Sequence, residues 1–175
     1  GGEEFNITVN SYCESGFSSD ELSGDQLSDA IYNRNKAVEE RFKIKFNFIS
    51  GEYNEITQKV QSSVLAGDDQ YQLLANHALA SNSWVMAEIL NNWYDIEYVN
   101  FDKPWWSSSN KNDLTYNDTV YLAVGDFSLT TIGRTYAIYF DKIHADSYNL
   151  PDMYQLVRDG KWTIDKLSDL SKDIY

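Results

Sequence analysis

Few side chains in this sequence occur in the patterns that catalysis requires. Acidic residues are paired at three places, Asp20/Glu21, Glu39/Glu40 and Asp68/Asp69. Hydrolysis of a glycosidic bond uses two carboxyl groups that face the same bond, but sequence neighbours on a helix or turn point apart. Because acidic side chains are mostly exposed, we interpret these pairs as surface charge, at roughly nine to one.

The two histidines, His77 and His144, have no second His or Cys at the spacing of a metal site. His77 directly follows a predicted parallel strand, where the ligand-contacting loops of open α/β sheets lie, so it is a candidate for lining a cleft. Cys13 has no His or Asn partner at a nucleophile spacing, and Ser128 lacks a Gly-x-Ser-x-Gly setting. With no glycine-rich phosphate motif either, we expect no catalytic residue, metal or cofactor.

The aromatic residues are a stronger signal. The chain has 5 tryptophans and 13 tyrosines, and aromatic faces stack on the C–H surfaces of sugars while Tyr and Trp also form hydrogen bonds. Trp84 and Trp93 are interpreted as core residues, at about three to one. Trp105 and Trp106 follow Pro104 in an irregular stretch, so they either face a cleft or pin this loop to the sheet.

Composition limits the partners of the chain. Its 175 residues carry a net charge of −13, and such a surface repels phosphate backbones and anionic membranes. Nucleic acid is therefore not an expected partner. The single cysteine, Cys13, excludes an internal disulfide, and no stretch approaches the ~20 apolar residues that a membrane-spanning helix needs.

Hydrophobic periodicity predicts alternating strands and helices in the first half of the chain. Alternating or apolar runs predict strands over residues 5–10, 44–49 and 71–75. Helical spacing predicts helices over residues 25–42, 54–65 and 81–92, the first capped by Asp25 or Ser28. This order is typical of βαβ units, so we expect an α/β fold with a parallel, twisted sheet flanked by helices.

The second half has weaker signals. A hairpin is predicted over residues 114–124, around Asn117-Asp118, followed by a strand-like run over 136–140. Helices are expected over residues 142–148 and 150–157, and a last one is capped by Thr163. This last helix keeps its apolar phase through Ile174 to the final residue, so we expect the sequence to be the N-terminal part of a longer protein.

Several motifs, in order, resemble one protein family. Residues 121–128 form a strand-like run that leads to a Gly-containing crossing, 136–142 end in an aromatic-Asp-Lys turn, and 159–166 open a helix with Trp-Thr. Residues 62–68 and 102–106 add a Gly-Asp helix end and an Asp-Lys-Pro-Trp-Trp motif. The chain thereby resembles the extracellular solute-binding proteins of family 1, the carbohydrate-type ligand-capturing subunits of ABC importers.

The resemblance implies a periplasmic-binding-protein-like (type II) fold. Residues 3–124 would form most of the N-terminal lobe, 125–128 the inter-lobe crossing, and 129–175 the beginning of a C-terminal lobe. It implies a non-enzyme that captures a small polar solute such as a sugar and delivers it to the membrane permease of an ABC importer. The parent would be extracellular and lipid-anchored at the cell surface. The alternative is a secreted carbohydrate-active enzyme or carbohydrate-binding module.

The resemblance also implies where ligand contacts lie. They would come from loops 11–14, 76–79 and 125–128, because the carboxyl ends of parallel strands share one edge of the sheet. The candidate ligand contacts are Tyr12, Glu14, Asn76, His77, Trp105, Trp106, Asp126 and Ser128. Tyr12 and the Trp pair would stack on the solute, while Glu14, Asn76 and Asp126 would form hydrogen bonds with its hydroxyl groups.

Overall fold

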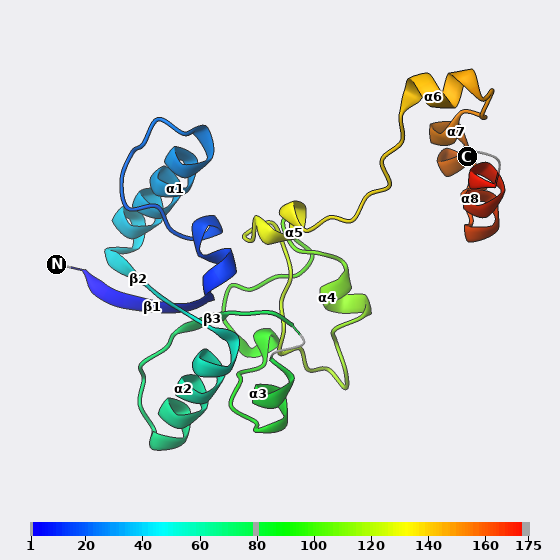
Figure 1. Cartoon of the computed structure of the whole chain (residues 1–175). Helices are drawn as coiled ribbons and strands as arrows, with labels where there is room; N and C mark the ends of the chain where they lie inside the picture. Colours follow the sequence, from blue (N-terminus) through cyan, green and yellow to red (C-terminus); the bar gives the residue numbers. More distant parts are fainter. Residues whose placement is uncertain (1, 79–80, 173–175) are drawn as a thin grey trace. The chain divides into compact units, whose positions relative to one another are not determined.

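The computed structural model describes residues 2–78 and 81–172. The chain divides into two compact units, Gly1–Thr135 and Tyr136–Tyr175, which are described separately. The first unit contains a three-stranded parallel sheet with helices on both of its faces (Figure 1). The predicted α/β class with a parallel sheet is therefore confirmed.

The sheet is built around its first strand. Strand β1 (Glu3–Asn10) lies between β2 (Ile44–Gly51) and β3 (Leu73–Ala75), in the order β2-β1-β3. Ile7 is paired with Phe48 on one side and with Leu73 on the other. Because side chains opposite each other in register point to the same face, these three apolar residues form one row across the sheet.

Helix α1 (Gln26–Phe42) connects β1 to β2, after the 3-10 helix η1 (Ser11–Gly16). The Asp25 carboxylate caps α1 by accepting a hydrogen bond from the Ser28 N–H at 2.8 Å, as the sequence predicts. This bond holds the pKa of Asp25 below its usual value. The helix ends at Lys43, whose φ of 56° is left-handed.

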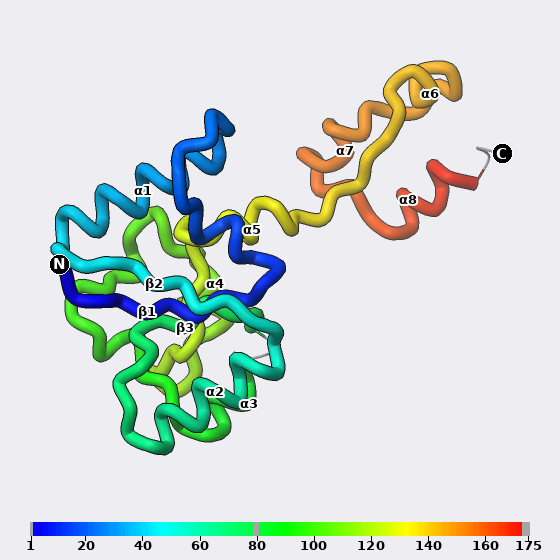
Figure 2. Tube along the Cα trace, turned by 60° about the vertical axis from the view of Figure 1, so that its left-hand side comes forward, coloured from blue at the N-terminus to red at the C-terminus, as the bar shows by residue number. Residues whose placement is uncertain are grey.

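Helix α2 (Tyr53–Ala66) covers the opposite face of the sheet from α1 (Figures 1 and 2). Its buried residues Ile56 and Val60 pack against Trp84 of helix α3 (Asn82–Met86) and form the hydrophobic core of the unit. Gly67, with a φ of 75°, ends α2 and donates its N–H to the carbonyls of Ser63 and Val64. The predicted Gly-Asp helix end is confirmed as a left-handed glycine cap.

Glu39 ties α1 to β2. Its Oε1 accepts a hydrogen bond from the Phe46 N–H at 2.9 Å, and its Oε2 pairs with Lys36 Nζ at 2.7 Å. The Lys36 hydrogen bond is the largest influence that lowers the pKa of Glu39, and the bond from Phe46 adds to it.

We expect Glu39→Gln to lower the free energy of unfolding at pH 7 by about 0.5–1 kcal/mol. A carboxyl whose pKa is lowered by folding stabilises the fold above its unfolded pKa of about 4.3, and this contribution disappears as pH falls through the folded pKa. Urea unfolding at pH 7 and at pH 3.5 should show a smaller difference between wild type and variant at the lower pH. An equal difference at both values would contradict this role of the charge.

Sequence periodicity overestimates regular structure after residue 81. The predicted helix over 81–92 is limited to α3, because Glu88 has a left-handed φ of 56° that ends the helical path. The predicted hairpin is reduced to a single bridge between Tyr116 and Thr119. The rest of the first unit is irregular apart from η2 (Trp93–Asp95), α4 (Ser109–Asn112) and α5 (Thr130–Gly133).

The second unit consists of α6 (Lys142–Ser147), α7 (Met153–Arg158) and α8 (Ile164–Ser171), close to the predicted helices. The predicted strand-like run over 136–140 is not a strand, and no strand occurs among the described residues 136–172 to pair with it. Thr163 caps α8 as predicted. The predicted continuation of this helix to Ile174 lies outside the described residues.

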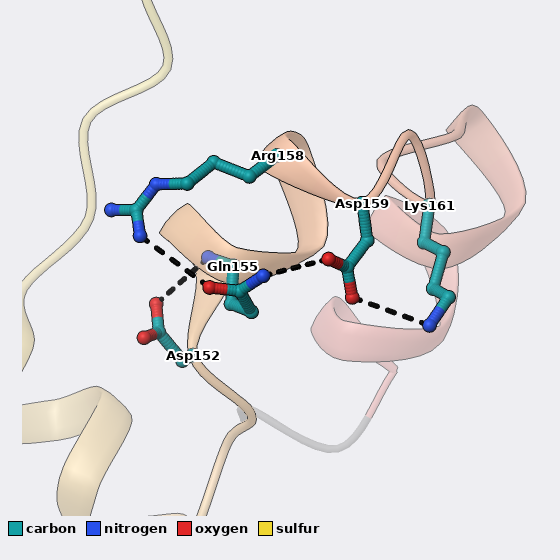
Figure 3. Close-up of polar contacts among 5 residues, drawn as sticks. All are labelled: Asp152, Gln155, Arg158, Asp159 and Lys161. Carbon is teal, nitrogen blue, oxygen red and sulfur yellow. Dashed lines mark hydrogen bonds and ion pairs between the residues drawn. The ribbon is translucent and has the colours of Figure 1, made fainter.

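Side-chain hydrogen bonds fix the turns of the second unit (Figure 3). The Asp152 carboxylate caps α7 at the Gln155 N–H, and the Gln155 amide donates to Asp159 Oδ1 at 2.7 Å. Lys161 pairs with the same carboxylate at 3.3 Å. Asp141 caps α6 in the same way through the N–H groups of Ile143 and His144. These contacts explain the aromatic-Asp-Lys turn as a helix start.

Candidate ligand-binding pocket

The first unit contains a pocket of about 580 Å³, a volume within the range of small-molecule sites. It lies on the face of the sheet that α1 also covers, and Asn10 at the end of β1 and Ala75 at the end of β3 both line it. The carboxyl ends of the parallel strands therefore open into it, as expected for binding sites in open α/β sheets.

The floor of the pocket is the apolar row of the sheet. Phe48, Ile7 and Leu73 line it from β2, β1 and β3, and Phe46 extends the row along β2. Successive side chains of a strand point to opposite faces of the sheet. The neighbouring residue Thr8 points to the opposite face, where it lies beside α2 residues Ile56 and Val60.

An aromatic cluster forms a wall of the pocket. Trp106 is at its centre, with edge-on ring contacts to Trp93, Phe101 and Phe127 at centroid distances of 6.0, 5.0 and 5.8 Å. Trp93, Trp106 and Phe127 line the pocket, whereas Phe101 is buried behind them. Trp93 therefore lines the pocket as well as packing against Trp106, whereas the sequence predicted only a core position for it.

Residues 121–124 line the pocket as a segment without a strand partner. The fully buried side chain of Asn110 replaces such a partner, since its Nδ2 donates to the Val124 carbonyl and its Oδ1 accepts from the Val124 N–H, both at 2.7 Å. Trp93 adds a bond from its Nε1 to the Tyr121 carbonyl at 3.2 Å. The Val124 carbonyl also accepts from the Ser107 N–H at 2.9 Å, so it is the Val124 N–H that depends on the buried amide for its acceptor.

Gly125 allows the two aromatic loops to approach each other. It forms an antiparallel bridge with Trp106, and a Cβ at this position would lie 2.5 Å from the Trp105 carbonyl oxygen and 3.2 Å from the Trp106 ring. A backbone oxygen at 2.5 Å cannot move aside as a flexible side chain would. The crossing motif therefore requires glycine here for steric reasons.

We expect Gly125→Ala to lower the free energy of unfolding by about 1–3 kcal/mol, the usual cost of overpacking. Thermal or urea unfolding of the variant measures this cost. Gly133→Ala is a matched control, because a Cβ at Gly133 meets no atom within 4 Å. If the two variants are equally stable, the close approach at Gly125 is not a structural requirement.

Polar groups stand at one end of the pocket. Tyr12 lines it and is half exposed, with the Arg134 guanidinium 5.2 Å from its ring centroid. Burial, and then the neighbouring Cys13, raise the pKa of Tyr12 above its usual value. Asn76 also lines the pocket, and its Oδ1 accepts the His77 N–H at 2.9 Å.

The predicted contact residues divide into two groups. Tyr12, Asn76, His77, Trp106 and Ser128 are brought together around the pocket. Glu14, Trp105 and Asp126 do not line it, and all three are exposed. Within the loop predicted over 76–79, Leu79 lies outside the described residues. The role of each residue toward a ligand stays a prediction.

Helix α1 contributes to the pocket, which the sequence-based expectations did not include. Arg34, Asn35 and Val38 line it, and a signal for this was present in the helical phase. Arg34 and Asn35 lie three and four positions after the buried Ile31, and four and three before Val38. Polar residues at the phase of the inward stripe indicate a wall that faces a cavity rather than a dry core.

No cluster of three or more His, Cys, Asp or Glu side chains able to hold a metal ion occurs among residues 2–78 and 81–172. Within the same ranges, no helix combines the length and apolarity that crossing a bilayer requires. Comparison of the chain with protein-family models, curated proteins and solved structures gives no match.

Proposed function

We propose that this chain belongs to an extracellular solute-binding protein that captures a carbohydrate or a similar small polar solute for an ABC importer, without catalysing a reaction. The observation that carries the proposal is the pocket at the carboxyl ends of the parallel strands, with its aromatic wall and few polar groups. Such a combination of apolar surface and sparse hydrogen-bonding groups is typical of small-molecule sites.

The arrangement of the pocket suits a sugar ring. The rings of Trp106 and Phe127 offer surfaces for the C–H groups of a pyranose. Tyr12, Asn76 and Ser128 stand on the same pocket and offer hydroxyl and amide groups to the sugar hydroxyls. The resemblance in motif order between residues 62 and 166 supports assignment to the importer class rather than to another sugar-binding class.

Isothermal titration calorimetry of the chain with a panel of monosaccharides and disaccharides tests this proposal. We expect saturable binding of at least one sugar, and chromatography of the same mixture should return that sugar unchanged. Released product would favour the alternative, a secreted carbohydrate-active enzyme. Absence of binding across the panel would contradict carbohydrate as the solute class.

A further inference from the structure

The pocket differs in charge from the rest of the molecule. The chain carries 27 acidic and 14 basic side chains, yet Arg34 is the one Asp, Glu, Lys or Arg among the described residues that line the pocket. An acidic protein thus has a pocket without a lining carboxylate and with a guanidinium. This difference in charge between the pocket and the rest of the chain indicates that the pocket discriminates between solutes by their charge.

Arg34 is held in place by neutral acceptors. Its Nη2 donates to the Phe17 carbonyl and to Asn35 Oδ1, both at 2.9 Å, and its Nε donates to the same Oδ1 at 3.0 Å. Asn35 Nδ2 also donates to the Phe17 carbonyl at 2.8 Å. A guanidinium has five N–H donors, so these bonds orient the group and leave the two N–H groups of Nη1 without an acceptor among the described residues.

Arg34 also has no acidic partner. No carboxylate of residues 2–78 and 81–172 lies within 4 Å of its guanidinium. Burial alone lowers the pKa of Arg34, with no compensating charge. Arg34 is nevertheless an exposed residue, so water reduces the cost of leaving this cation unpaired, and an anionic ligand would supply the partner that the described residues do not.

Two further features favour an acceptor-rich ligand. Asn76 lines the same pocket, and its Nδ2 is buried without a hydrogen-bond partner in the described part of the chain. The guanidinium of Arg134 stacks on Tyr12, which also lines the pocket, and so adds a second positive charge beside it. Both features point to a solute that brings hydrogen-bond acceptors and negative charge.

We propose that the pocket selects a solute that bears a carboxylate, such as a hexuronic acid, and that Nη1 of Arg34 binds this carboxylate. The inference rests on the proposed solute-binding function and specifies its substrate class. A guanidinium matches the planar carboxylate better than an ammonium does, and charge-assisted hydrogen bonds of this kind are shorter and stronger than neutral ones. The aromatic wall would contact the ring of the same solute.

Calorimetric titration with two matched pairs of probes tests the inference: D-glucuronate against D-glucose, and D-galacturonate against D-galactose. We expect the wild type to bind one of the acids at least tenfold more tightly than its neutral partner, the gain of about one charge-assisted bond. Arg34→Gln should remove this preference. Arg34→Lys should retain part of it, because the charge stays and the fork geometry is lost.

Arg41→Gln is the matched control, since Arg41 belongs to the same helix and does not line the pocket. It should leave the preference unchanged. Far-UV circular dichroism of each variant shows whether α1 remains folded, and Arg34→Lys keeps the test valid if Arg34→Gln does not fold.

The outcomes separate this inference from the proposed function. If neutral hexoses bind as tightly as the acids, or if Arg34→Lys and Arg34→Gln keep the full preference, carboxylate selection is wrong while sugar capture stands. If citrate or benzoate binds through Arg34 and no sugar binds, carboxylate selection stands and carbohydrate capture is wrong. If no carboxylate binds at all, the inference is overturned.

Discussion

Trp106→Ala is expected to weaken sugar binding by at least tenfold and to lower the free energy of unfolding by about 2–4 kcal/mol. Both effects follow from its position at the centre of the aromatic cluster, where one ring contacts Trp93, Phe101 and Phe127 and also faces the pocket. Calorimetry measures the affinity, and urea unfolding measures the stability. Trp106→Phe should recover part of both, because a smaller ring keeps some of the edge-on contacts.

The adjacent tryptophan provides the matched control. Trp105 is 53% exposed and does not line the pocket, so Trp105→Ala should change affinity by less than about twofold and stability by less than about 1 kcal/mol. The affinity losses caused by truncating these two neighbouring tryptophans are thus expected to differ by at least about fivefold. Equal losses in the two variants would contradict the assignment of the pocket wall to Trp106.

Trp84→Ala is expected to lower the free energy of unfolding by about 3–5 kcal/mol, the usual cost of truncating a large buried aromatic residue. Trp84 is 1% exposed and packs against Ile56 and Val60, and its Nε1 donates to the Thr57 carbonyl at 3.2 Å. Equilibrium unfolding in urea, followed by circular dichroism, measures the loss.

Met86→Ala is the control for this core prediction. Met86 lies on the same short helix but is 83% exposed, so its truncation should change stability by about 0.5 kcal/mol or less. If Trp84→Ala costs no more than Met86→Ala, the contact between α2 and α3 is not the core of the unit.

The first half of the fold was predictable because local signals and tertiary contacts agree there. Asp25 caps α1 and Gly67 ends α2, and the alternation of residues 44–49 matches a strand with one apolar face toward the pocket. Each signal depends on neighbours in sequence. When local propensity and hydrophobic pattern agree in this way, a helix or strand can be predicted from a single sequence.

The second half was less predictable because its structure depends on distant side chains. Residues 120–124 have the pattern of a strand, but their polar backbone groups are satisfied in part by the buried amide of Asn110 and by Asn92, whose Oδ1 accepts from the Val120 N–H. Residues 136–140 have strand propensity, but the described residues of their own unit, 136–172, contain no strand to pair with them. A segment with high β-propensity forms a strand only when another strand pairs with it.

The candidate site could be predicted only for residues next to strand ends. Tyr12, Asn76 and His77 follow β1 and β3 directly, so topology alone brings them to one edge. Glu14 and Asp126 were expected at the same edge but do not line the pocket, and Glu14 lies on the 3-10 helix η1 rather than in a loop. Arg34 comes from a helix, and its lack of a counter-ion is visible only in three dimensions.

The central claim is that this aromatic pocket binds a small polar solute, and the five tryptophan indole N–H signals of a ¹⁵N-labelled sample test it most directly. Titration with the tightest-binding sugar of the panel should shift the signals of Trp93 and Trp106, which line the pocket. The signals of Trp84 and Trp105, which do not line the pocket, should stay in place. Shifts confined to these two, or no indole shift at a sugar concentration that saturates the calorimetric signal, would contradict the account.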